Sequence, residues 1–185
     1  MPFGSLWLPV LVATVVVWLA SAILHMALKY HRADIKQLPD EAAVAAALGK
    51  DRPAPGVYVL PYCAEMSQMK DPAYVKKYQD GPVALVTVLR NGVPSMGKHL
   101  VQWLLLCFLV SLTAAYVARH TLHPDSARLL VMRITATVAF AGYAYGYLQD
   151  SIWKAIPWGN SLRGLVDAAV YAVLTGFAFY FLWPA

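Results

Sequence analysis

Charged residues are scarce in this chain of 185 residues. Asp, Glu, Lys and Arg together make up 14% of it, whereas a soluble domain carries about 25%. Hydrophobic residues make up 59%, which excludes an intrinsically disordered chain. Only two cysteines are present, which excludes a small scaffold held together by disulfides. The remaining class is that of integral membrane proteins.

Basic residues are missing before Lys29 and are concentrated after it. Ten of the fifteen Lys and Arg residues lie between Lys29 and Lys98, together with seven of the ten acidic residues. This segment contains no dense basic run, so nucleic acid is not predicted as a partner. The uneven distribution instead indicates orientation, because basic residues accumulate on the cytoplasmic side of a membrane.

Four apolar runs are long enough to cross a bilayer as helices, which takes about 20 residues. We therefore predict an all-α membrane protein with four transmembrane helices in an antiparallel bundle. The predicted transmembrane helices cover residues 6–28, 100–118, 129–148 and 165–183. The first run could instead be a signal peptide, because Ala20-Ser21-Ala22 has the small residues of a cleavage site. The absence of basic residues before the run, and their presence directly after it, favours an uncleaved helix.

The same charge distribution predicts the topology. Residues 29–98 are expected on the internal side of the plasma (inner) membrane, and both termini on the external side. The loop between the second and third helices is then external. Residues 150–163, which contain two tryptophans, are predicted to form an interfacial loop on the internal side.

Residues 29–98 are too many for a simple turn and predict a small αβ subdomain between the first two transmembrane helices. A helix is predicted over 41–48, after the capping residue Asp40, and a second over 72–79, with Pro72 at its first position. Short strands are predicted over 57–60 and 83–90, where Val and Leu recur.

Small residues recur at a spacing of four in the last two predicted transmembrane helices. Such stripes let helices approach closely in lipid. They predict that these two helices pack against each other, and they could also bind a protein partner or a second copy of the chain. The residues concerned are Gly142 and Gly146 in the third helix, and Ala168, Ala172 and Gly176 in the fourth.

Metal binding is one prediction for the polar residues on the internal side. His31 and Asp34 offer a nitrogen and an oxygen ligand three positions apart. Cys63, Met66 and Met69 offer softer sulfur ligands. The alternative for the two methionines is an apolar helix face, and no Cys-x-x-Cys or His-x-x-x-His motif supports a metal site.

Haem binding is a second prediction, because His25 and His99 end adjacent antiparallel helices at similar depth, as bis-histidine ligation requires. Transport is a third, because ionisable residues in transmembrane helices often mark a pathway. Asp150 and Asp167 are the candidate acids, and Arg163 or Lys154 is the predicted ion-pair partner of Asp167.

No nucleophile motif, phosphate loop or dinucleotide fingerprint is present in the sequence, so an enzyme is not favoured. No particular cofactor is indicated either. The sequence predicts an accessory, scaffold or assembly subunit of the membrane. The alternatives are a membrane redox protein that binds a metal or haem, and a small-solute transporter that works as an oligomer.

Overall fold

The computed structural model describes residues 3–184. The terminal residues, which are predicted to be external, lie outside this range. The chain forms two compact units. The bundle comprises residues up to 36 and from 95 onwards, and the inserted unit comprises residues 37–94.

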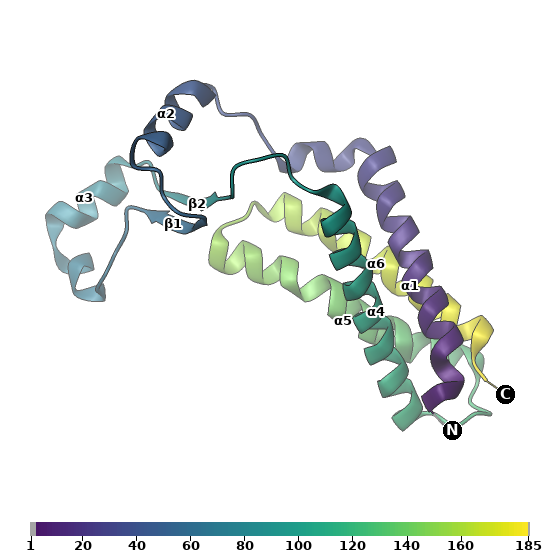
Figure 1. The fold of residues 1–185 in the computed structure, drawn as a ribbon. Coiled ribbons are helices and arrows are strands. Elements are labelled where there is room, and N and C mark those ends of the chain that lie inside the picture. The colour runs from purple at the N-terminus through teal and green to yellow at the C-terminus, as the bar shows by residue number, and fades with distance from the viewer. Residues whose placement is uncertain (1–2, 185) are drawn as a thin grey trace. The chain divides into compact units, whose positions relative to one another are not determined.

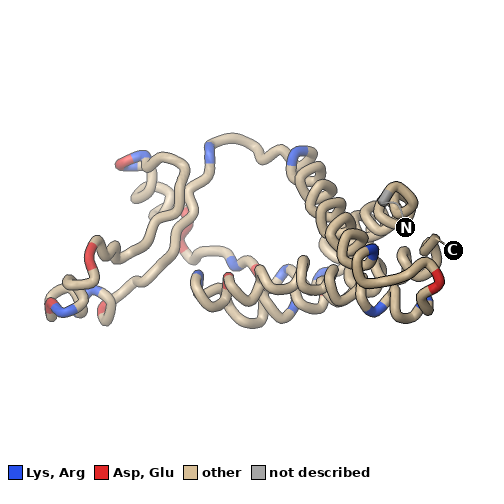
Figure 2. The backbone as a smooth tube through the Cα atoms, turned by 90° about the horizontal axis from the view of Figure 1, so that it is seen from below, with Lys and Arg blue, Asp and Glu red and all other residues tan. Residues whose placement is uncertain are grey.

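Four long helices build the bundle (Figure 1). The first, α1, covers Trp7–Ala22 and continues as a π-helical turn over Ile23–Ala27. The others are α4 (Met96–Thr121), α5 (Arg128–Lys154) and α6 (Trp158–Leu182). All four are long and apolar enough to cross a membrane, and charged residues are sparse along them (Figure 2). The predicted all-α class with four apolar helices is confirmed.

The four helices pack around a common core. Helix α1 contacts α4 and α6, and α5 contacts the same two helices. Successive helices run in opposite directions (Figure 1), as predicted for an antiparallel bundle. Apolar side chains such as Val17, Val131 and Phe179 fill the centre, while many leucines and valines on the outer faces are exposed. An apolar outer surface of this kind fits contact with a lipid bilayer.

Helices α5 and α6 extend further than hydropathy predicts. The interfacial loop predicted over 150–163 is reduced to residues 155–157, because α5 ends at Lys154 and α6 begins at Trp158. An ion pair of 2.7 Å between Asp150 and Lys154, one turn apart, supports the last turn of α5. The helix stops at Ala155, whose backbone is left-handed with φ of 52°.

Close packing between α5 and α6 is confirmed at the end of the small-residue stripe. A Cβ atom at Gly176 would lie 3.0 Å from the Cβ atom of Ala136 and 3.0 Å from Cγ of Met132. Ala168 and Ala172 are buried on the same face of α6. The two backbones therefore approach through these small residues.

The predicted role of the third-helix glycines needs correction. The atoms nearest to a Cβ atom at Gly142 belong to Val110 of α4, at 3.1 Å, so this glycine lies against α4. A Cβ atom at Gly146 would meet no atom within 4 Å. Gly164 was not part of the predicted stripe. A Cβ atom at this position would lie 2.6 Å from the ring of Tyr147. Gly164 continues the α6 stripe by one more step of four.

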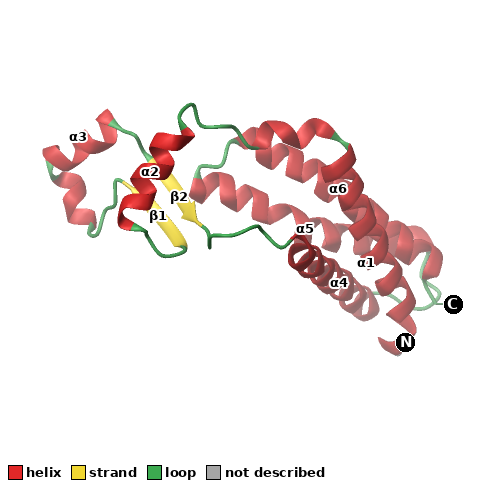
Figure 3. Ribbon diagram, turned by 45° about the horizontal axis from the view of Figure 1, so that its top comes forward, coloured by secondary structure: helices red, strands yellow, loops and turns green. Residues whose placement is uncertain are grey.

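The inserted unit contains the predicted helices and strands in the predicted order (Figure 3). Its helices are α2 (Glu41–Asp51) and α3 (Pro72–Asp80), capped by the side chains of Asp40 and Asp71. Strands β1 (Gly56–Leu60) and β2 (Ala84–Val88) pair antiparallel, with Tyr58 opposite Val86. No residue of this unit is fully buried.

Candidate functional site

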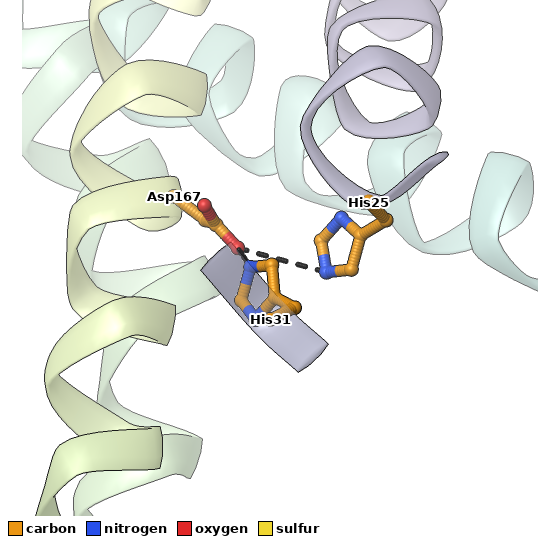
Figure 4. A group of neighbouring side chains, drawn as sticks. All are labelled: His25, His31 and Asp167. Carbon is orange, nitrogen blue, oxygen red and sulfur yellow. Dashed lines mark hydrogen bonds and ion pairs between the residues drawn. The ribbon is translucent and has the colours of Figure 1, made fainter. Parts of the chain in front are cut away.

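A buried carboxylate lies where the end of α1 meets the beginning of α6. The side chain of Asp167 in α6 is 0% exposed. Its Oδ2 atom lies 2.8 Å from Nε2 of His31 and 3.6 Å from Nε2 of His25 (Figure 4). The hydroxyl of Tyr30 donates a hydrogen bond to the other oxygen, Oδ1. Four side chains therefore meet at this end of the bundle.

The chain after α1 changes direction, and this change brings the two histidines together. On a continuous helix, six positions rotate by about 240°, so His25 and His31 would lie on different faces. Instead Leu28 is extended (φ −86°, ψ 131°), and a 3₁₀ helix over Lys29–Asp34 follows it. The imidazole rings of His25 and His31 consequently stack, with centroids 4.4 Å apart and planes at 7°.

The other ring nitrogen of each histidine has its own acceptor. Nδ1 of His25 lies 3.0 Å from the backbone oxygen of Ser21, which can only accept a hydrogen bond. Nδ1 of His31 lies 2.6 Å from Oδ2 of Asp34. Protons on the Nδ1 atoms leave both Nε2 atoms directed at Asp167, which is the arrangement found around metal-binding histidines.

Asp34 is held in turn by residues at the beginning of α6. Nε of Arg163 donates to Oδ1 of Asp34 at 2.6 Å, and Nδ2 of Asn160 donates to the Asp34 backbone oxygen at 3.0 Å. Burial by itself raises the pKa of Asp34, but hydrogen bonds to His31 and Arg163 outweigh it and leave the pKa below its ordinary value. Asp34 is therefore ionised at neutral pH and suited to orient His31.

The cluster contains more carboxylates than permanent positive charges. Asp34 and Asp167 supply two carboxylates, and the guanidinium of Arg163 is the one permanent positive charge bonded to either of them among the described residues. A proton on an imidazole, a proton on Asp167 itself or a bound metal ion can balance the second carboxylate.

The ligand spacing suits a metal ion. One nitrogen from each of His25 and His31 and one oxygen of Asp167 all lie within 4.8 Å of one another. With metal–ligand distances of about 2.0–2.2 Å, two ligand atoms of a tetrahedral metal lie about 3.4 Å apart. The separation of 3.6 Å between His25 and Asp167 matches this value, and the 2.8 Å at His31 needs a sub-ångström adjustment. The two nearly parallel imidazole rings would also have to tilt toward a shared ion.

Five of the residues singled out in the sequence are brought together: His25, His31, Asp34, Arg163 and Asp167. Their pairing differs from the prediction. Arg163 was expected to pair with Asp167 but binds Asp34, because the 3₁₀ helix carries Asp34 to the first turns of α6. Lys154, the alternative partner, pairs with Asp150.

The remaining candidates lie elsewhere. His99 is exposed on α4, and among the described residues its ring makes no hydrogen bond, ion pair or ring contact, so the structure does not join it to His25. Cys63, Met66 and Met69 belong to the inserted unit, whereas His31 and Asp34 belong to the bundle. The Cys63 thiol donates to the backbone oxygen of Glu65, and the Met66 side chain is exposed.

Three contributors to the site were missed in the sequence. Tyr30 belongs to no recognisable metal motif and reaches Asp167 only because of the turn at Leu28. Ser21 contributes its backbone oxygen, four positions before His25. Asn160 had a detectable signal, because it precedes Arg163 by three positions and so shares its helix face.

Comparison of the chain with protein-family models, with curated proteins and with solved structures found no match.

Proposed function

We propose that the chain is a multi-pass integral membrane protein that binds a divalent transition-metal ion through His25, His31 and Asp167. The carrying observation is the convergence of two Nε2 atoms on one buried carboxylate, while each Nδ1 atom is engaged by another acceptor. Two histidines and one carboxylate are a ligand set typical of catalytic zinc and of non-haem iron(II). The proposed location is the plasma (inner) membrane, with the inserted unit on the internal side.

The competing proposal is a structural lock in an accessory or scaffold subunit. A protonated His31 between Asp34 and Asp167 would fasten the end of α1 to α6 without any metal. This accounts for His31 alone. It leaves unexplained why Nε2 of His25 is directed at the same oxygen atom and why the two rings stack. Metal ligation accounts for the direction of Nε2 of His25, so we favour it.

The test is metal binding by the purified full-length protein in detergent, after removal of metals with a chelator. Cobalt(II) is the probe, because its visible absorption reports the ligand geometry. We expect one equivalent to bind wild-type protein. Removal of a residue that only supports a metal ligand typically lowers metal affinity 10- to 100-fold. The variants His31→Asn and Asp167→Asn remove a ligand itself, so their affinity for cobalt(II) should fall by at least this factor.

His99→Asn is the matched control, because it removes an exposed histidine outside the cluster. It should bind cobalt(II) like the wild type. Circular dichroism identifies any variant that has not folded. Equal cobalt(II) affinity in the wild type and in folded Asp167→Asn protein would overturn the proposal, as would failure of the wild type to bind the ion.

A further inference from the structure

A cavity adjoins the two histidines of the proposed metal site. It has a volume of about 370 Å³ and is lined by residues that include His25, His31, Tyr147, Asp150, Ile156 and Asn160. Pockets for small molecules span about 300–1,000 Å³. The cavity is thus large enough for a small molecule beside the metal ligands.

The proposed metal site is closed on one side and open on the other. The side chains of Asp167 and His31 are 0% and 16% exposed, whereas that of His25 is 47% exposed. Three protein ligands leave at least one coordination position free, which is the feature that separates catalytic from structural zinc sites. The cavity walls include both histidines but not Asp167, so the cavity lies on the histidine side of the proposed site.

The carboxylates on the cavity wall already have partners. Asp34 is paired with Arg163, and Asp150 with Lys154. The hydroxyl of Ser161 donates to the backbone oxygen of Tyr147 at 2.8 Å. A ligand in the cavity therefore meets no unpaired charge on these walls, and the metal ion itself is left as the group that would attract it.

We infer that a small exogenous molecule with a metal-coordinating donor atom completes the coordination from this cavity. Water or hydroxide is the resident ligand, and small anions or nitrogen donors replace it. The inference rests on the proposed metal binding and deepens it: the centre is one with an exchangeable ligand. A metal ion of this kind lowers the pKa of bound water and polarises bound carbonyl or phosphoryl groups.

The test uses cobalt(II)-loaded wild-type protein, titrated separately with sodium azide and with imidazole. We expect a saturable change in the visible absorption for at least one of them, with the cobalt still bound after gel filtration. No change with either ligand while cobalt(II) stays bound overturns this inference and leaves the proposed metal binding intact. Removal of the cobalt by both ligands also overturns it. Absence of cobalt(II) binding would contradict both proposals.

A second variant tests the route of entry. Ile156→Trp adds bulk at the cavity wall without changing a ligand, and Ile152→Trp places the same side chain at an exposed position outside the lining. The first should weaken binding of azide or imidazole at least tenfold while cobalt(II) affinity is unchanged, and the second should leave both affinities unchanged. Equal binding by the two cobalt-loaded variants would contradict entry through this cavity.

Discussion

Both ring nitrogens of His31 face carboxylates, and these come from different parts of the chain. Asp34 lies in the same 3₁₀ helix, and Asp167 comes from the last helix of the bundle. A histidine held in this way has a fixed ring orientation. Asp34 would thus affect the proposed metal ion through His31, without contacting the ion.

Replacement of Asp34 tests this role. Asp34→Asn should lower cobalt(II) affinity by about 10- to 100-fold, because the amide holds the Nδ1 proton of His31 less strongly than a carboxylate does. Asp150→Asn is the matched control: it also lines the cavity and pairs with a basic residue, but it contacts neither histidine. Equal affinities for the two variants, measured by cobalt(II) titration, would show that Asp34 does not orient His31.

The sequence places the ligands on one side of the membrane but does not reveal their pairing. Charge distribution and helix order predict that the end of the first helix and the beginning of the last helix lie on the same side. The contact between Arg163 and Asp34 depends on the extended Leu28 and on the 3₁₀ helix after it, and no sequence pattern predicts that turn. The residues of the site are therefore predictable, whereas its geometry follows from a local break in the helix.

At the level of elements, α5 and α6 form a hairpin, and the short distance between their backbones depends on small residues of α6. Gly164, Ala168, Ala172 and Gly176 follow at steps of four and so lie along one face. The two glycines are at the ends of this row, and both would collide with α5 if they carried a Cβ atom. Association of helices in lipid depends on such close approach, because there is no hydrophobic driving force between them.

Gly164→Ala and Gly146→Ala are a matched pair of substitutions. The first places a methyl group 2.6 Å from the ring of Tyr147, and the second places one in open space. We expect Gly164→Ala to cost about 1–3 kcal/mol, as overpacking typically does, and to lower the temperature of thermal unfolding in detergent. Gly146→Ala should leave it unchanged or raise it. A higher unfolding temperature for Gly164→Ala than for Gly146→Ala would contradict the predicted packing.

Hydropathy predicts the number and type of these helices but not their ends. The predicted third transmembrane helix stops at residue 148, where polar residues begin, whereas α5 continues to Lys154. Apolar composition marks the part of a helix that lies in lipid, and backbone hydrogen bonding continues beyond it. The ion pair between Asp150 and Lys154 is the kind of interaction that extends a helix into water.

At the level of the whole molecule, the orientation in the membrane decides whether the proposed metal site lies on the internal side. The two native cysteines offer a test, because Cys63 lies in the inserted unit and Cys107 is buried in the bundle. A membrane-impermeant maleimide should label Cys63 in inside-out vesicles but not in intact cells. Asp125→Cys in a Cys63→Ser background should show the opposite pattern. Labelling of Cys63 in intact cells would reverse the proposed topology.

The two units should also differ in their stability. The bundle contains a buried core, whereas the inserted unit has no fully buried residue. Backbone amides exchange rapidly where few apolar contacts resist local opening. In detergent, hydrogen exchange followed by mass spectrometry should therefore be faster in β1 and β2 than in α5 and α6. Equal protection would indicate that another surface covers the inserted unit.

Ser21 joins the end of α1 to α4 as well as to the histidine cluster. Its backbone oxygen bonds Nδ1 of His25, and its hydroxyl oxygen accepts a hydrogen bond of 2.7 Å from the indole of Trp103. The fluorescent side chain of Trp103 is thus connected to the proposed ligand His25 through the single residue Ser21. Quenching of Trp103 emission by a paramagnetic ion offers an intrinsic optical signal of occupancy, and Trp103→Phe protein is the reference that isolates it from the other tryptophans.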